Sequence, residues 1–370
     1  MIPVVKPLVG EEEQNAVRAV LESGQLASGE MVNRFETSFA DFVGAKYAVA
    51  TSSGTTALHL ALLAAGVQPG DKVITTPFTF AATANAILFC GAIPVFVDIE
   101  PATLNIDPLA VEAAAQMPGV KALLVVHLYG TPCDMASLTT IAKDKGLVLI
   151  EDCAQAHGAT FGGRQAGNFG AAGAFSFYAT KNMTTGEGGM VVSNREDIYH
   201  SLKLLVNHGS PSRYRHEILG YNYRLTEMAA AIGLIQLQKL PLWTKIRQNN
   251  ASYLTGELKD LKKLVLPQEP QGCQCVYHQY TVRTESRDAL AEHLKKWCVG
   301  TAIHYPTPVH QQPLYQKLGF VNYRLPVAEK AAEQVLSLPV YPALKNEELR
   351  HIVAALRKFG DEEIRGRFLT

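Results

Sequence analysis

Short apolar segments alternate with amphipathic segments along the first 240 residues. The apolar segments have the length of buried strands, and the segments between them carry apolar residues at spacings of three and four, as one face of a helix does. This alternation is typical of a mostly parallel sheet flanked by helices. The strands are expected at residues 47–50, 72–75, 94–97, 122–126 and 147–150.

Local signals place two helices within this pattern. Phe35, Phe39 and Phe42 recur at spacings of four and three, which puts them on one inward face of a helix. Asp107 directly precedes Pro108, and this pair favours a helix start because a carboxylate caps free N–H groups and proline fits the first turn.

The composition changes after an alanine-rich helix that is expected over residues 226–240 and is expected to end at Pro241. Beyond it we expect a long helix from about Trp243, a strand over residues 277–284 and terminal helices after a proline-rich stretch. The sequence therefore predicts an α/β fold. A large domain with an N-terminal arm is expected over residues 1–240, and a smaller α+β domain over residues 241–370.

Overall composition excludes several classes of function. Lys and Arg total 34, as do Asp and Glu, so no net charge favours nucleic acid or an anionic membrane. No stretch has the apolar core of a signal peptide or the length of a membrane span, so we expect a cytoplasmic protein. The six cysteines lack the paired spacing of a zinc site, and we expect reduced thiols and no metal.

Four separated segments carry the candidate chemistry, and each also permits an ordinary structural role. Residues 52–59 (SSGTTALH) follow a strand and open a helix, where free N–H groups and hydroxyls suit a phosphate or form a plain cap. Asp152 lies just past an apolar strand, at the sheet edge where ligands bind. Its carboxylate could hold a cationic ring nitrogen, ligate magnesium or cap a helix.

The third segment, FSFYATKNMTTGEGG, places Lys181 between an aromatic strand and a turn rich in Thr and Gly. Most lysines are solvated, but burial here would lower the pKa and leave a neutral amine for Schiff-base formation. The fourth segment, residues 220–226 (GYNYRLT), names no ligand alone. Together the segments match what pyridoxal 5'-phosphate (PLP) requires, namely a phosphate cradle, an acid for the pyridine nitrogen and an amine for the aldehyde.

Through these motifs, and over residues 24–341, the chain resembles the DegT/DnrJ/EryC1/StrS family of nucleotide-sugar aminotransferases, which have the type I fold of aspartate aminotransferase. The resemblance implies that Lys181 forms the Schiff base with PLP and that Asp152 keeps the pyridine nitrogen protonated. Gln155 matches a residue near the ring hydroxyl, and Phe80 matches the aromatic residue that stacks on the ring. The phosphate-binding positions are matched by Gly54, Thr55 and Ser176.

The resemblance also bears on assembly and on the substrate. Asn222 matches a phosphate ligand from the neighbouring subunit, which implies a homodimer with composite active sites. Weaker candidates for contact with the sugar or nucleotide, each of which could be purely structural, are His157, His208, Arg224, His304, Tyr305 and His310. Cys153 replaces the family's usual alanine and Ala179 its frequent proline, and neither change removes a functional group.

The implied reaction moves an amino group, usually from glutamate, through pyridoxamine phosphate to a nucleotide-linked keto-sugar. The turn at residues 182–189 resembles that of members acting at C4 of a 6-deoxyhexose, whereas residues 304–313 occur in C3 enzymes as well. The alternatives are a 3-keto-sugar or aminocyclitol aminotransferase and a non-catalytic PLP-binding regulatory protein. A sugar dehydratase of the same family has histidine at the lysine position, and Lys181 argues against it.

Overall fold

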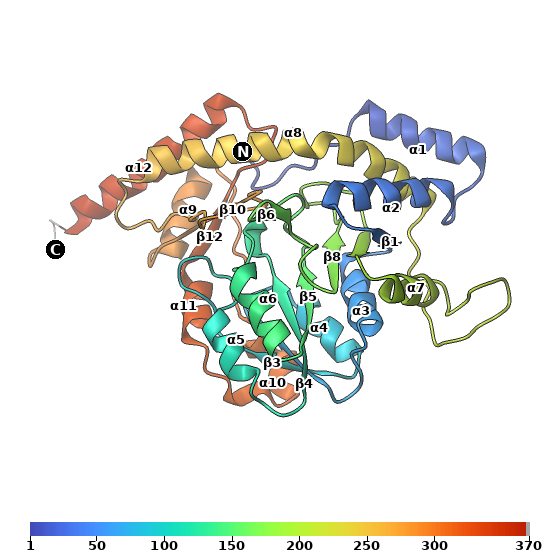
Figure 1. Cartoon of the computed structure of the whole chain (residues 1–370). Coiled ribbons are helices and arrows are strands. Elements are labelled where there is room, and N and C mark those ends of the chain that lie inside the picture. The colour runs from blue at the N-terminus through green and yellow to red at the C-terminus, as the bar shows by residue number, and fades with distance from the viewer. Residues whose placement is uncertain (368–370) are drawn as a thin grey trace.

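The computed structural model describes residues 1–367 and the side chains of residues 1–360. A seven-stranded sheet lies at its centre, and all its strands run parallel except β9, which is antiparallel to both neighbours (Figure 1). In sheet order the strands are β1 (Tyr47–Thr51), β9 (Gly189–Ser193), β8 (Ala172–Ser176), β5 (Val148–Asp152), β4 (Val120–Val126), β2 (Lys72–Thr75) and β3 (Ile93–Phe96). The predicted α/β class and mostly parallel sheet are confirmed.

Helices cover both faces of this sheet because successive residues of its strands point to opposite sides. Ala122 and Leu124 pack on one face, whereas Leu123 and Val125 pack on the other. The first face is covered by α3 (Gly54–Ala64), α4 (Ala82–Phe89) and α7 (Glu196–Leu205). The second face is covered by α2 (Glu30–Val43), α5 (Pro108–Ala114) and α6 (Met135–Asp144).

Both local helix predictions are confirmed. Phe35 and Phe39 of α2 are fully buried, and Phe42 packs partly buried against the same core. Asp107 caps α5, since its Oδ1 accepts a hydrogen bond from the backbone N–H of Leu109 (2.9 Å).

The prediction that a helix ends at Pro241 is wrong, because α8 (Glu227–Leu258) passes through this residue. Proline removes one helical hydrogen bond and usually ends a helix. Here packing on both sides of the proline keeps the helix continuous. Leu240 packs in the core that α2 and α8 form with the large sheet, and Leu254 packs in a separate C-terminal core. In Figure 1, α8 runs along the top of the molecule from α1 (Glu11–Ser23) and α2 to α12 (Asn346–Arg367). The domain division at residues 240/241 stays a prediction.

The C-terminal core surrounds a two-stranded antiparallel sheet, β11 (Tyr280–Arg283) and β12 (Val335–Leu338). The strand expected over residues 277–284 is thus present but shorter. The remaining elements are α9 (Arg287–Lys296), α10 (Pro313–Lys317), α11 (Pro326–Gln334), the short strands β6 (Thr160–Phe161), β7 (Arg164–Gln165) and β10 (Cys273–Gln274), and 3-10 turns at Leu128–Gly130, Val309–Gln311 and Phe320–Asn322. Within residues 1–367, no helix is long and apolar enough to cross a membrane.

Candidate active site

The carboxyl ends of the parallel strands open onto a cavity of about 510 Å³. Segments far apart in the sequence form its wall. The residues predicted from the sequence that line it are Gly54, Thr55, Phe80, Asp152, Gln155, Ser176, Lys181, His304 and Tyr305. A larger cavity of about 740 Å³ near Lys262 and Arg283 contains none of them, so the smaller cavity is the candidate site.

Asp152 is the last residue of β5, and its side chain is 5% exposed. Oδ2 accepts a hydrogen bond from the hydroxyl of Thr83 (2.8 Å), and Oδ1 accepts one from the backbone N–H of Ala154 (3.1 Å). Burial raises the pKa of Asp152, while these two hydrogen bonds and the charge of Lys181 act in the opposite direction. The carboxylate is therefore fixed at the cavity wall, where a cationic group can pair with it.

Lys181 is partly buried in the turn between β8 and β9. Two hydrogen bonds hold this turn. The backbone N–H of Lys181 donates to the carbonyl of Tyr178 (2.9 Å), and the hydroxyl of Thr184 donates to the carbonyl of Phe177 (3.0 Å). Burial lowers the pKa of Lys181, and the nearby Asp152 partly offsets this effect. The cavity thus holds an amine that loses its proton more readily than a surface lysine does.

The N-terminus of α3 forms another part of the wall. The hydroxyl of Ser53 accepts a hydrogen bond from the N–H of Thr56 (3.2 Å) and caps the helix. The N–H groups of Gly54 and Thr55 belong to the first turn, where the helix itself offers no acceptor. A Cβ atom on Gly54 would lie 2.5 Å from the Cβ of Ser176, so only glycine lets the helix approach β8 this closely. Two N–H groups and the Ser176 hydroxyl therefore line one region, which suits a phosphate.

Gln155 connects two loops at the cavity. Its Oε1 accepts a hydrogen bond from the N–H of Tyr129 (2.6 Å), and its Nε2 donates to the hydroxyl of Tyr305 (3.1 Å). The ring of Phe80 is 62% exposed and lies 6.2 Å from the ring of Tyr305. Since Phe80 lines the cavity and is largely exposed, its ring is available to stack on a flat ligand. His304 completes this wall, and its carbonyl accepts a hydrogen bond from the hydroxyl of Tyr129.

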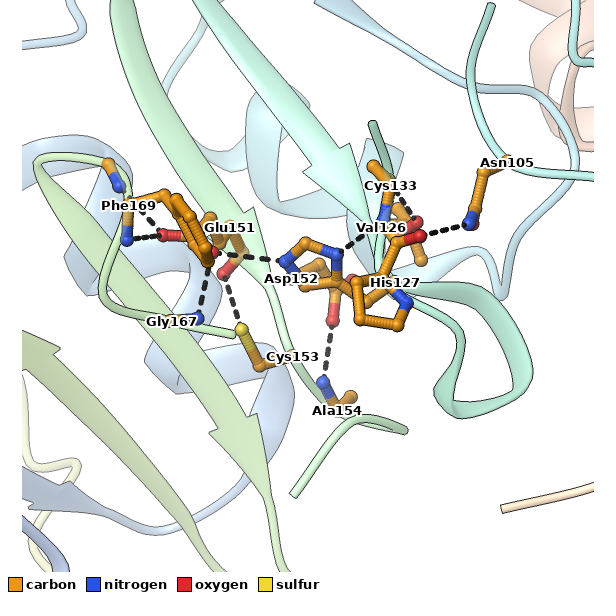
Figure 2. A network of polar contacts seen from close by, with 12 residues as sticks. Asn105, Val126, His127, Cys133, Glu151, Asp152, Cys153, Ala154, Gly167 and Phe169 are labelled. Carbon is orange, nitrogen blue, oxygen red and sulfur yellow. Dashed lines mark hydrogen bonds and ion pairs between the residues drawn. The ribbon is translucent and has the colours of Figure 1, made fainter. Parts of the chain in front are cut away.

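A buried carboxylate that the sequence did not reveal lies next to Asp152 on β5 (Figure 2). Glu151 is fully buried, and its side chain points to the opposite face of the strand. One of its oxygens lies 3.0 Å from Nε2 of His127, and the backbone N–H of Cys133 donates to Nδ1 of the same ring (3.1 Å). Nε2 therefore carries the proton and donates to Glu151. The Glu151 carboxylate also accepts hydrogen bonds, each of 2.7 Å, from the backbone N–H groups of Gly167, Phe169 and Gly170.

These contacts give Glu151 a structural role. Glu151, His127 and Cys153 lie close enough together to be considered as metal ligands. Both oxygens of Glu151, however, already accept two hydrogen bonds each, so the cluster is a hydrogen-bond network that fixes the loop leading into β8. A second acid directly before Asp152, at the end of an apolar segment, was the sequence signal for it.

Two of the predicted histidines lie in the protein interior and do not line the cavity. The ring of His157 packs on Phe175 and Phe177, with centroid distances of 5.5 and 5.8 Å. Burial, with the charge of Lys181 acting in the same direction, lowers its pKa to about 3. His310 is buried with its Nε2 3.2 Å from Glu329.

The remaining predicted residues, His208, Asn222 and Arg224, belong to the segment between α7 and α8. Part of this segment projects from the body of the chain (Figure 1), whereas Asn222 pairs with Asn207 just after α7. Asn222 is exposed, and the guanidinium of Arg224 donates to the side chain of Asn207 (2.7 Å). None of the three lines the cavity of its own chain.

Sequence reasoning missed His278 and Gln279, which line the cavity from the segment before β11. The ring of His278 reaches Asn182, the neighbour of Lys181, with 3.1 Å between Nδ1 and Oδ1. Polar residues within the strand expected over residues 277–284 were the available signal, but nothing in the spacing links them to Lys181.

Comparisons with known proteins agree with this geometry. Residues 7–357 match the DegT/DnrJ/EryC1/StrS aminotransferase family. The chain is 44% identical over 343 residues to a pleiotropic regulatory protein of Geobacillus stearothermophilus, covering 92% of each protein. It is 41% identical over 352 residues to dTDP-3-amino-3,4,6-trideoxy-α-D-glucose transaminase of Streptomyces venezuelae, covering 95% of this chain and 92% of the relative. The structure resembles that of DesV from S. venezuelae with a TM-score of 0.93 and 39% identity, covering 97% of this chain and 99% of DesV.

Proposed function

The chain belongs to the DegT/DnrJ/EryC1/StrS aminotransferase family, and we propose that its cavity at Lys181 and Asp152 aminates a nucleotide-linked keto-sugar. It is a PLP-dependent sugar aminotransferase, and similar proteins have been solved in the PLP form and with bound pyridoxamine phosphate. The observation that carries the proposal is that one cavity combines a partly buried amine, a fixed carboxylate at a strand end and a helix N-terminus.

The contacts in the cavity support a role for each residue toward PLP. The first-turn N–H groups of Gly54 and Thr55, with the Ser176 hydroxyl, would hold the phosphate. The Asp152 carboxylate would keep the proton on the pyridine nitrogen, and Phe80 would stack on the ring. Gln155, which is held in place by two hydrogen bonds, would lie near the ring hydroxyl.

When bound, PLP supplies an aldehyde that takes up the amino group and a protonated ring that withdraws electrons from the reacting carbon. The chain supplies the proton transfer. The Nζ of Lys181, whose pKa is lowered by burial, would move the proton from the α-carbon of the donor amino acid to the former aldehyde carbon of the cofactor within the first half-reaction. In the second half it would move a proton in the opposite direction, from that cofactor carbon to the aminated carbon of the sugar. The hydrogen bonds that Thr83 and Ala154 donate to Asp152 favour its charged form against the effect of burial, and this carboxylate would pair with the protonated ring nitrogen.

We also propose a homodimer with composite active sites. Glutamate and a nucleotide-linked sugar both carry negative charge, yet among the described residues that line the cavity Lys181 is the single Lys or Arg. The segment between α7 and α8 offers Asn222 and Arg224, which do not line the cavity of their own chain. A two-fold partner would bring this loop to the other cavity and supply the missing positive charge.

Mixing two inactive variants tests this arrangement. Lys181→Ala removes the amine from one chain, and Asn222→Ala combined with Arg224→Ala removes the loop groups from the other. After unfolding and joint refolding at equal amounts, about a quarter of wild-type activity is expected, because half of the dimers are mixed and one of their two sites is native. Each variant refolded alone is the control. No recovery in demonstrated mixed dimers, or full activity of a monomer, contradicts the proposal.

Two candidates remain for the position of the keto group. The turn at residues 182–189, next to Lys181, supports C4 of a 6-deoxyhexose, and we propose this substrate first. The 3-keto sugars are the second candidate, because the S. venezuelae relative and two others, 40% and 38% identical, are named for chemistry at position 3.

A spectroscopic assay tests the function and separates these substrates. Adding glutamate to the purified protein is expected to convert the PLP form to the pyridoxamine form, as seen by absorbance. This form should then return to PLP with 4-keto-6-deoxy nucleotide sugars, with the 3-keto counterparts tested in parallel and glutamine compared as donor. Return with the 3-keto sugars alone overturns the C4 assignment. No response to any donor favours the regulatory role that the name of the G. stearothermophilus relative suggests.

A further inference from the structure

His278 reaches the cavity from the C-terminal part of the chain, and its side chain is 9% exposed. It lies in the segment before β11, whereas Lys181 lies between β8 and β9. A hydrogen bond joins the two segments, since Nδ1 of His278 is 3.1 Å from Oδ1 of Asn182. The imidazole is therefore tied to the residue that directly follows the lysine.

The hydrogen bonds of Asn182 decide which nitrogen of His278 carries the proton. Nδ2 of Asn182 donates to the backbone carbonyl of Val276 (3.2 Å), so Oδ1 is the atom that faces the imidazole. An amide oxygen can only accept, and Nδ1 of His278 must donate to it. In the neutral ring Nε2 then carries a lone pair, on the edge away from Asn182. The ring lines the cavity, so this edge is the one available to it.

The surroundings keep this ring neutral. Burial lowers the pKa of His278 well below its ordinary value, and the charges of Lys181 and of Arg247 on α8 act in the same direction. The other titratable groups that face the ring are His304 and His157. The cavity therefore contains a neutral hydrogen-bond acceptor, the His278 ring, which is near enough to Lys181 for the charge of the amine to lower its pKa.

We propose that His278 is a positioning residue for Lys181, whose free amine donates a hydrogen bond to Nε2 and is thereby held toward the substrate carbon. The inference rests on the proposed function, because Lys181 must be the amine that moves the proton. A lysine side chain has a flexible stem of four carbons, and proton transfer requires the lone pair of Nζ to point at the substrate carbon. An acceptor anchored to the neighbouring Asn182 restricts that freedom without taking the proton itself.

Two substitutions at His278 separate positioning from packing. His278→Phe keeps a ring and removes the acceptor. His278→Gln keeps both groups, because its amide NH2 can donate to Asn182 while its oxygen replaces Nε2. His157→Phe is the matched control, since His157 is also buried near Lys181 but does not line the cavity. If His278→Phe does not fold, His278→Met replaces it, because a flexible thioether fills the space with only a weak acceptor.

The first readout is the half-reaction with glutamate. In His278→Phe its single-turnover rate should fall roughly 10²-fold, the effect of misplacing a catalytic group. The half-saturating glutamate concentration should stay unchanged, and the deuterium isotope effect with α-deuterated glutamate should increase. His278→Gln should recover most of the rate, and His157→Phe should not show the increased isotope effect.

The second readout needs no cofactor. In the cofactor-free protein, competitive labelling with acetic anhydride reports the pKa of Lys181. This pKa should fall in His278→Phe, because the ammonium loses an acceptor, and should return toward wild type in His278→Gln. Equal changes in the Phe and Gln variants, the same change in His157→Phe, or no change in His278→Phe overturns the inference. If borohydride fixes PLP to another lysine in the wild-type protein, the proposed function fails instead, and this is known before any variant is made.

Discussion

Lys181→Ala is expected to abolish turnover and the covalent attachment of PLP while leaving the fold intact. The side chain supplies two things, the amine that bonds to the cofactor and the base that moves the proton. Loss of general acid–base catalysis alone costs about 10²- to 10⁴-fold in rate. Asp152 keeps its two hydrogen-bond donors, Thr83 and Ala154, when the amine is removed, so the melting temperature should change little.

Borohydride reduction followed by peptide mass analysis measures the attachment directly. Wild-type protein should carry the reduced cofactor on the peptide that contains Lys181, and the variant should carry none. Lys145→Ala, which removes an exposed lysine at the end of α6, is the control and should behave as wild type. A small primary amine in the buffer should restore part of the glutamate reaction by replacing the missing base. A reduced adduct that persists in Lys181→Ala would show that another lysine binds the cofactor.

Asp152→Asn is expected to bind PLP and to react with glutamate roughly 10²- to 10⁴-fold more slowly, as roughly 3–5 kcal/mol are lost when one partner of a buried ion pair is removed. An amide has the shape of the carboxylate but cannot hold the proton on the ring nitrogen. The fold should tolerate it, because the hydroxyl of Thr83 can accept from the amide as readily as it now donates to Oδ2. Stopped-flow absorbance with glutamate measures the rate, and thermal unfolding measures the stability.

Glu151→Gln is the matched control, since it makes the same chemical change at the adjacent residue of β5. Its NH2 group would face backbone N–H groups that now donate to the carboxylate, such as those of Phe169 and Gly170. We expect a loss of roughly 1–3 kcal/mol in the free energy of unfolding, the cost of buried unsatisfied donors. If Asp152→Asn loses stability in the same way and keeps its rate, Asp152 is structural and its proposed role is wrong.

The sequence predicted the sheet because burial on both faces leaves continuous apolar segments. The strand expected over residues 72–75 is found at Lys72–Thr75. Polar ends were harder to predict. β5 was expected to stop at residue 150 but extends to Asp152, because Val126 and Ala174 of the neighbouring strands pair with this residue. Apolar periodicity describes side chains, whereas the length of a strand is set by backbone partners that lie elsewhere in the chain.

The candidate site divides in the same way. Lys181 was predicted from the turn that surrounds it, because a turn depends on neighbours in the sequence, whereas Ser176 was implied by the family resemblance. His278 was missed because its connection to Asn182 exists only after the C-terminal segment folds over the cavity. His157 was a weaker candidate for contact with the sugar or nucleotide, with a purely structural role as the alternative, and its ring packs on the aromatic residues Phe175 and Phe177. A motif shows which residues follow a strand but not which of them face the ligand.

The unbroken course of α8 through Pro241 has a mechanical consequence. Near one end, Gln236 accepts a hydrogen bond from the N–H of Thr184 in the lysine turn (3.2 Å), and further along Arg247 donates to the carbonyl of Tyr277, beside His278 (3.2 Å). The lysine turn and the segment that contains His278 are thus both hydrogen-bonded to one continuous helix, α8. A closing motion around an arriving sugar nucleotide would carry the amine and the imidazole as a single rigid body. The amine that moves the proton and the imidazole proposed to position it are then assembled before the substrate binds, and the binding free energy of the substrate remains available for orienting the sugar.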